Sequence, residues 1–203
     1  MKKVLLALTL ILALVPRPTF SQPPTIIEQT QRSTVKVETL YIGDEGEQVY
    51  FCTGTIVGII RVLTADHCVP PNYRQIAVNG VLGARIVKRQ VDGKAYDGLI
   101  LLEVPAGLGP IIQVAKQEPK IGDYLVTLGN IDRIGTRVAL RRSASGYGVD
   151  DANKILGLDG VLVRGMSGGP VINEAGELVG VNQSVVQGLG LTTRLKVIRE
   201  FLK

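Results

Sequence analysis

Alternation of apolar and polar residues is the main pattern of the chain once the first twenty or so positions are set aside. It is clearest over residues 34–41, where the period of two is that of a half-buried strand. Most other apolar runs are short, rich in β-branched residues and bounded by Gly, Pro, Asn or Asp. The pattern therefore predicts an all-β domain. The expected strands are residues 34–41, 49–57, 61–64, 75–78, 84–89, 99–103, 111–114, 124–128, 136–143, 171–173, 178–186 and 189–192.

Residues 194–202 carry a helical period instead. Leu195, Ile198 and Leu202 fall on one face of a helix, and Thr193 stands where a capping residue belongs. A single apolar stripe is what a helix normally buries in its own domain. We therefore expect a short C-terminal helix docked on the β-domain, with a partner-binding helix as the alternative.

The first residues have the composition of an export signal. A lysine pair precedes an apolar run over residues 4–15, which is much shorter than the ~20 apolar residues of a membrane-spanning helix. The small residues Thr19 and Ser21 predict cleavage before Gln22. We expect residues 1–21 to be a signal peptide and the mature protein to be secreted or periplasmic, with no stable membrane span. An uncleaved anchor is the alternative.

Charge and size limit the remaining functions. Loss of the leader removes three basic residues, so the formal net charge falls from +5 to +2. About 180 residues suffice for one cooperative domain. A nucleic-acid partner would need a concentrated basic face, and none is expected. The one local basic cluster, interpreted as a solvated face or alternatively as a subsite for acidic residues, is Arg133, Arg137, Arg141 and Arg142.

A glycine-rich turn holds the clearest chemical signal. The segment Gly165-Met166-Ser167-Gly168-Gly169 can direct one hydroxyl and two backbone N–H groups to the same point. A serine hydroxyl needs a neighbouring base at neutral pH, and His67 is the only histidine of the chain. Ser167 is therefore the candidate nucleophile and His67 the candidate base. A plain turn serine and a half-buried structural histidine are the alternatives when each is taken singly.

The order of these two residues separates two hydrolase families. In α/β-hydrolases the histidine follows the serine, whereas here it precedes the serine. Leu63-Thr64-Ala65-Asp66-His67-Cys68 resembles the histidine box of trypsin-like serine peptidases, and Gly165-Met166-Ser167-Gly168-Gly169-Pro170 resembles their serine box. The resemblance implies a chymotrypsin-like fold of two packed Greek-key six-stranded β-barrels over residues 22–203. The two halves would meet near residues 115–122, with the active site between them.

A serine triad also needs a carboxylate that orients the histidine. Asp97 is the expected one, because it opens an apolar strand in a segment that resembles the family's Asp-x-Ala-Leu-Leu. Asp92 is the nearest competitor, but its surroundings are those of an ordinary turn. Asp66 adjoins His67, and adjacent side chains seldom point at each other. The resemblance thus implies a serine endopeptidase that forms an acyl-enzyme on Ser167.

The resemblance also implies how a peptide substrate would bind. The backbone N–H groups of Gly165 and Ser167 are expected to form the oxyanion hole. One segment before the serine would line the pocket for the side chain that precedes the scissile bond, and a later strand would pair with the substrate backbone. An uncharged residue at position 161 favours small or aliphatic side chains there. The expected substrate-binding residues are Val161, Leu162, Val163, Arg164, Gln183, Ser184 and Val185.

The two cysteines fit an exported protein. Oxidising compartments turn a well-placed pair into a disulfide. A bridge from Cys52 to Cys68 would close a loop of about 17 residues and contribute about 3 kcal/mol, and it resembles the family's histidine-loop disulfide. Zinc bound by Cys52, His67 and Cys68 is the alternative, although adjacent His and Cys lack the usual ligand spacing. No metal and no cofactor are expected.

The serine-box half resembles bacterial HtrA-like peptidases, through Leu158-Asp159 and residues 169–182. HtrA-like members usually carry a peptide-binding PDZ domain, which this chain is expected to lack. Met166 stands where digestive-type members have an aspartate that receives a new amino terminus, so no such zymogen switch is expected. The expected partner is a protein or peptide substrate. A catalytically silent protein-binding module of the same fold and an esterase with the same triad are the alternatives.

Overall fold

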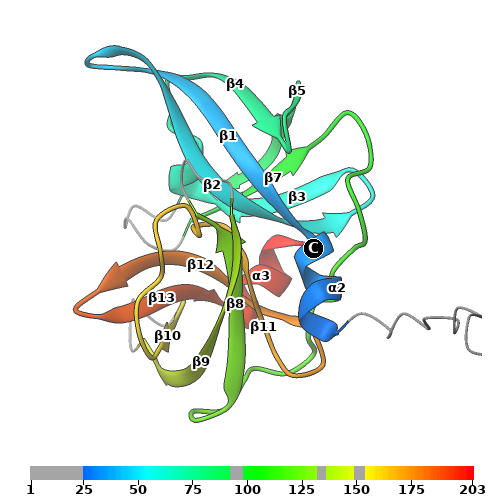
Figure 1. Cartoon of the computed structure of the whole chain (residues 1–203), viewed down its shortest axis with the longest axis vertical. Coiled ribbons are helices and arrows are strands. Elements are labelled where there is room, and N and C mark those ends of the chain that lie inside the picture. Colours follow the sequence, from blue (N-terminus) through cyan, green and yellow to red (C-terminus); the bar gives the residue numbers. More distant parts are fainter. Residues whose placement is uncertain (1–24, 92–97, 132–135, 149–153) are drawn as a thin grey trace, which may run out of the picture.

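Two curved β-sheets, packed against each other, make up the body of the protein (Figure 1). The computed structural model describes residues 25–91, 98–131, 136–148 and 154–203. The predicted all-β fold with two barrel-like halves and a short C-terminal helix is confirmed. The halves differ in closure, because the second forms a closed barrel whereas the first is a curled sheet with two edges.

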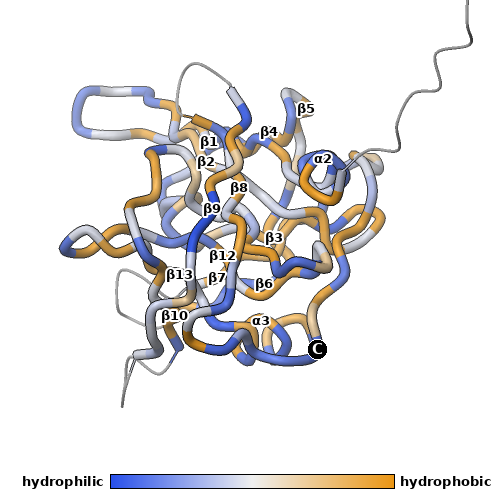
Figure 2. The backbone as a smooth tube through the Cα atoms, turned by 60° about the horizontal axis from the view of Figure 1, so that its bottom comes forward, coloured by the Kyte–Doolittle hydropathy of each residue, from blue (hydrophilic) through white to orange (hydrophobic). Residues whose placement is uncertain are grey.

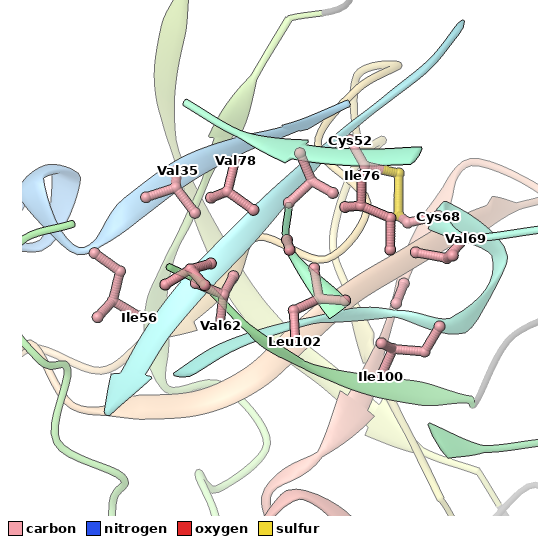
Figure 3. Close-up of a cluster of buried hydrophobic side chains, with 14 residues drawn as sticks. Val35, Cys52, Ile56, Val62, Cys68, Val69, Ile76, Val78, Ile100 and Leu102 are labelled. Atoms are coloured by element: carbon pink, nitrogen blue, oxygen red, sulfur yellow. A yellow bond between two sulfur atoms is a disulfide. The ribbon is translucent and has the colours of Figure 1, made fainter. Parts of the chain in front are cut away.

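The first sheet has seven strands in the described part of the chain, in the order β5-β4-β1-β2-β3-β7-β6. All of its neighbouring strands are antiparallel. Alternate residues of these strands point inward and form a core of valine, isoleucine, leucine and the cysteine pair (Figure 3). The strands are β1 (Thr34–Gly43), β2 (Gly46–Gly58), β3 (Arg61–Ala65), β4 (Tyr73–Val78), β5 (Val81–Leu82), β6 (Arg85–Gln90) and β7 (Leu99–Glu103).

The second sheet closes on itself in the order β10-β13-β12-β11-β8-β9, counted over the described residues. Each strand has two hydrogen-bonded neighbours along at least part of its length, which closes the barrel. Apolar and polar segments alternate along the strands of both halves, as the tube in Figure 2 shows. The strands are β8 (Tyr124–Asn130), β9 (Arg137–Tyr147), β10 (Ile155–Leu158), β11 (Pro170–Ile172), β12 (Leu178–Val186) and β13 (Leu189–Arg194).

Two α-helices and one 3-10 turn complete the described structure. Helix α2 (Ile26–Arg32) was not predicted; it begins with a capping box between Thr25 and Glu28. Helix α3 (Leu195–Phe201) buries its apolar face, as expected. The predicted cap was wrong, since Arg194 is the N-cap residue and Thr193 belongs to β13. None of the described helices has the length and apolarity that crossing a membrane requires.

The connection between the halves replaces one predicted strand. Residues 111–114 form no strand, and Val114 makes only an isolated bridge with Leu178. The segment instead bonds to both halves, because Ile112 N–H donates to the Ile56 carbonyl at 2.9 Å and Ala115 N–H donates to the Leu178 carbonyl at 3.0 Å. Strands β5 and β10 were also missed, since two and four residues are too few to show a period.

A shared hydrophobic cluster fixes the two halves against each other. It combines Leu63 of β3 and Leu99 of β7 with Leu128 of β8 and Val181 of β12, all at 0% exposure. Helix α3 adds its own apolar face to the same cluster. Because interiors of this kind are close-packed, β3 and β7 have a defined position relative to the second barrel.

Candidate active site

The serine turn connects β10 to β11 and is tightly hydrogen-bonded. Gly169 N–H donates to the Met166 carbonyl at 2.9 Å, and Gly168 N–H donates to the Asn182 carbonyl of β12 at 2.7 Å. Gly165 and Gly168 have φ values of +94° and +82°, which disfavour any residue with a Cβ. The glycines of this segment are therefore required by the backbone path of the turn.

Two threonines of β2, in the first half, hydrogen-bond to the serine turn. The Thr53 hydroxyl donates to the Gly165 carbonyl at 2.7 Å, and Thr53 N–H donates to the Ser167 carbonyl at 2.8 Å. The Thr55 hydroxyl donates a hydrogen bond to the Gly168 carbonyl at 3.3 Å. Both threonines are fully buried. Sequence reasoning missed them, and their only signal was two polar residues at alternate positions of a buried strand.

Gly168 brings the serine turn against the strand that leads into His67. A Cβ at Gly168 would collide with Thr53 and Thr64 and would lie 2.9 Å from the backbone nitrogen of Ala65. The Thr64 hydroxyl in turn donates to the Thr53 carbonyl at 2.7 Å. The two boxes singled out in the sequence are therefore in direct contact across the interface between the halves.

His67 is half-buried on the 3-10 turn η2 (Asp66–Cys68), which follows β3 directly. The predicted disulfide is confirmed: Cys68 is bonded to Cys52 of β2. The Sγ atom of Cys68 lies 3.7 Å from the carbonyl oxygen of Ser167. Burial lowers the pKa of the His67 imidazole below its ordinary value, and the negative charge of Asp66 opposes this lowering in part.

Asp97, the expected acid, and its competitor Asp92 both lie outside the described residues. Gly98, which directly follows Asp97, is described, and its carbonyl accepts a hydrogen bond from Asp66 N–H at 2.9 Å. The carboxylate of Asp66 accepts a hydrogen bond from Arg89 Nε at 2.6 Å. Asp66 is thus engaged with an arginine of β6.

The Ser167 hydroxyl donates to the carbonyl oxygen of Gln183 at 3.0 Å. The side chain of Gln183 turns inward with an exposed fraction of 2%. Its Nε2 donates to the Thr193 hydroxyl at 2.7 Å and to the Gly98 carbonyl at 3.2 Å. Gln183 therefore joins the second barrel to Gly98, the residue next to the expected acid. Its side chain is buried, so only its backbone could contact a substrate.

The N–H groups expected to form the oxyanion hole are unpaired with respect to the described chain. No described residue accepts a hydrogen bond from the backbone N–H of Gly165 or Ser167. Met166 between them is fully buried and packs against Gly129 of β8. Free backbone donors beside a serine hydroxyl are what stabilisation of an oxyanion requires.

The expected pocket wall is a surface segment with apolar side chains. Val161 and Val163 have exposed fractions of 49% and 37%, and Arg164 is also exposed. Leu162 is half-buried, and a Cβ at Gly190 of β13 would lie 3.2 Å from its Cγ. The segment is anchored to the barrel, since Gly190 N–H donates to the Gly160 carbonyl at 2.8 Å.

Strand β12 has a free side next to the serine turn. Ser184 and Val185 pair with β13, as part of the barrel. On the other side, backbone pairing with the serine turn ends at Asn182, whose N–H donates to the Gly169 carbonyl at 2.9 Å. Among the described strands, none pairs with residues 183–186 on this side. Val185 is 39% exposed.

Two arginines of the predicted basic cluster bond to backbone carbonyls. The arginine cluster is divided: Arg133 lies outside the described residues, Arg137 donates to the Gln31 carbonyl of α2 at 3.3 Å, and Arg142 donates to the Val161 carbonyl at 2.8 Å. The ligand atoms of Cys52, His67 and Cys68 do lie within 4.8 Å of one another. In the disulfide, however, neither sulfur is the thiolate that zinc binds.

Known proteins resemble this chain in sequence. The chain is 30% identical over 157 residues to the periplasmic serine endoprotease DegP of Salmonella typhimurium, covering 71% of this chain and 32% of that protein. It is 26% identical over 190 residues to the serine protease HTRA4 of Homo sapiens, covering 87% of this chain and 40% of that protein. The chain thus spans less than half the length of these curated relatives.

Solved structures share the fold. The active form of the Rv3671c protease from M. tuberculosis has a TM-score of 0.73 at 21% identity, covering 93% of this chain and 92% of that one. The serine endoprotease from Yersinia pestis has a TM-score of 0.70 at 24% identity, covering 90% and 66%. Residues 52–181, which carry both boxes and the strands that hold them together, match the family model described as trypsin-like peptidase domain, and the chain therefore belongs to that family.

Proposed function

We propose that this chain is an exported serine endopeptidase that cleaves peptide bonds with Ser167 as nucleophile, His67 as general base and Asp97 as the orienting acid. The observation that carries the proposal is the contact between the two boxes. Gly168 packs on the backbone of Ala65, two residues before His67, and Cys68 Sγ lies 3.7 Å from the Ser167 carbonyl. Contact between the segments that carry them is what an imidazole base and a serine nucleophile require in order to pair.

In the proposed reaction, the Ser167 hydroxyl leaves the Gln183 carbonyl and donates to His67. Because burial lowers the pKa of His67, the imidazole is neutral at neutral pH and accepts the proton as Oγ attacks the peptide carbonyl. The free N–H groups of Gly165 and Ser167 stabilise the resulting oxyanion, each by about 3 kcal/mol. His67 then protonates the leaving amine, and water hydrolyses the acyl-enzyme by the same steps.

Substrate would bind as an extended chain along the free side of β12. The N–H and C=O groups there offer strand pairing, which gives affinity without sequence preference. The neighbouring exposed side chains of Val161, Val163 and Val185 are uncharged. We therefore expect a small or aliphatic residue before the scissile bond.

Export is the compartmental part of the proposal. Residues 1–21 have the features of a signal peptide, and they lie outside the described residues. A disulfide beside the base is stable in an oxidising compartment. The Salmonella relative is named as a periplasmic endoprotease. These observations support a secreted or periplasmic location.

A cleavage profile of the mature protein on a peptide library tests the activity and the pocket together. Ser167→Ala is expected to lower kcat/KM by about 10⁴-fold or more and to abolish labelling by a fluorophosphonate. Asp97→Asn is expected to have an effect of about the same size, whereas Asp92→Asn serves as the matched control with a nearly unchanged rate. Failure of the folded protein to label would indicate a binding role. Hydrolysis of simple esters with casein left intact would indicate an esterase.

A further inference from the structure

We propose that Asp66 and Arg89 are positioning residues for the catalytic base, holding the His67 turn against the strand that begins beside the expected acid. The inference rests on the proposed peptidase function. It concerns residues that the family resemblance does not supply, since Asp66 stands where the family usually has alanine.

The ion pair joins two elements on either side of β7. Asp66 is the first residue of η2, and Arg89 lies near the end of the edge strand β6. Arg89 Nε and Asp66 Oδ1 are 2.6 Å apart, and the exposed fractions of the two side chains are 25% and 21%. Pairs that are mostly shielded from solvent constrain their residues more than exposed pairs do. The edge strand is therefore connected to the turn that carries His67.

Gly98 makes room for this pair. A Cβ at Gly98 would lie 2.5 Å from the Asp66 Cβ and 2.8 Å from the Gln90 carbonyl oxygen, so any side chain there would displace Asp66. This close approach by itself explains a glycine at position 98. The Gly98 carbonyl accepts Asp66 N–H at 2.9 Å. Asp66, Gly98 and Arg89 thus fit together as one arrangement, next to Asp97 in the chain.

The arrangement also places charge beside the imidazole. Asp66 favours the protonated form of His67, in opposition to burial. Arg89 neutralises part of the charge of Asp66. Among the described residues, Asp66 is the charged group that acts on the pKa of His67, and Arg89 is its ion-pair partner. Asp92, Lys94 and Asp97 lie outside the described residues. Removing Asp66 and removing Arg89 should therefore shift the pKa of His67 in opposite directions.

The single histidine allows a direct measurement that needs no activity. The imidazole of His67 would be titrated by NMR in mature Ser167→Ala protein, alone and combined with Asp66→Asn, Arg89→Gln or Glu103→Gln. Glu103→Gln is the matched control, since Glu103 pairs with Arg61 and Arg85 at the far end of the same three strands. We expect the pKa of His67 to fall in Asp66→Asn, to rise in Arg89→Gln and to stay unchanged in Glu103→Gln.

Kinetics on the Ser167 protein complete the test. Asp66→Asn and Arg89→Gln should each lower kcat/KM by about tenfold at pH 8, where His67 is neutral in every variant, because a displaced base reduces catalysis without a change of charge. The inference would be overturned if the His67 titration curves of Asp66→Asn, Arg89→Gln and Glu103→Gln coincided. An unchanged kcat/KM in Asp66→Asn would overturn it as well. Absence of activity in the unmodified mature protein contradicts the proposed function instead, and the NMR shifts still decide whether the pair acts on His67.

Discussion

The two halves of the molecule hold their candidate active-site segments in different ways. The second half is a closed barrel, and its serine turn is fixed by many hydrogen bonds from neighbouring strands. The first half is an open sheet, and its histidine sits on a 3-10 turn of three residues. Such a short turn has little stability of its own, and here a disulfide and an ion pair secure it. A disulfide thus fixes the histidine turn in the first half, whereas barrel closure and its hydrogen bonds fix the serine turn in the second half.

Each half also supplies hydrogen bonds to the candidate active-site segment of the other. Thr53 of the first half bonds to the serine turn, and Gln183 of the second half bonds to Gly98. Buried polar networks of this kind are stabilising only when their members are satisfied. The active-site segments are therefore expected to lose order together when the interface between the halves is disturbed.

The largest effect is expected at the contact between the halves. Gly168→Ala introduces a Cβ that collides with Thr53 and Thr64 and forces a positive φ on alanine. We expect a loss of about 4 kcal/mol or more in the free energy of unfolding, together with loss of activity. Denaturant unfolding measures this. Gly146→Ala is the control, since nothing lies within 4 Å of its added Cβ, and an equal loss there would show that contact with the first half is not the cause.

Removal of the disulfide should have the next largest effect. Cys52→Ala with Cys68→Ala opens a loop with a sequence separation of 16, which is expected to cost about 3 kcal/mol and to lower the melting temperature by about 6–12 °C. Calorimetry measures the shift. At low temperature the fluorescence and circular dichroism spectra should change little. Activity should nevertheless fall, because the bridge secures the His67 turn. Full activity in the double variant would mean that the open half needs no covalent support.

A smaller effect is expected from one hydroxyl of the first half. Thr53→Val removes the donor to the Gly165 carbonyl and the acceptor of Asn130 N–H at 2.8 Å, so it should cost about 1–3 kcal/mol and reduce kcat. The matched control is Thr39→Val. Thr39 is equally buried, but no described residue bonds to its hydroxyl, so valine should be neutral or stabilising there. Equal effects at both positions would contradict the role given to Thr53.

The smallest effect concerns the pH dependence of the base. Burial lowers the pKa of His67, and only the neutral imidazole accepts a proton from Ser167. Activity should therefore be present above this lowered pKa and disappear as the pH falls through it, so that the acid limb of kcat/KM lies below pH 6.5, the ordinary value. A pH profile in buffers of constant ionic strength measures the limb. A midpoint above 6.5 would show that nearby carboxylates outweigh burial.

Local pattern accounts for the parts of the structure that were predicted correctly. The alternation over residues 34–41 lies within β1, and the apolar face of α3 is buried as its spacing indicated. The disulfide followed from a pair of cysteines in a chain with an expected export signal. The wrong assignments came from contacts that no local pattern encodes. Thr193 is no helix cap, because its hydroxyl accepts a hydrogen bond from Gln183. Residues 111–114 form no strand, because this segment hydrogen-bonds first to one half and then to the other.

The sequence by itself determined the class of fold, the family and the residue types that could perform the chemistry, because a strand period, a glycine turn and a lone histidine are all read within a few neighbouring residues. Only the tertiary structure decided that Thr53 supports a turn 112 residues later and that Asp66 pairs with an arginine of β6. Such partners are selected by burial and close approach between segments distant in sequence, and those constraints arise only when the two halves pack together.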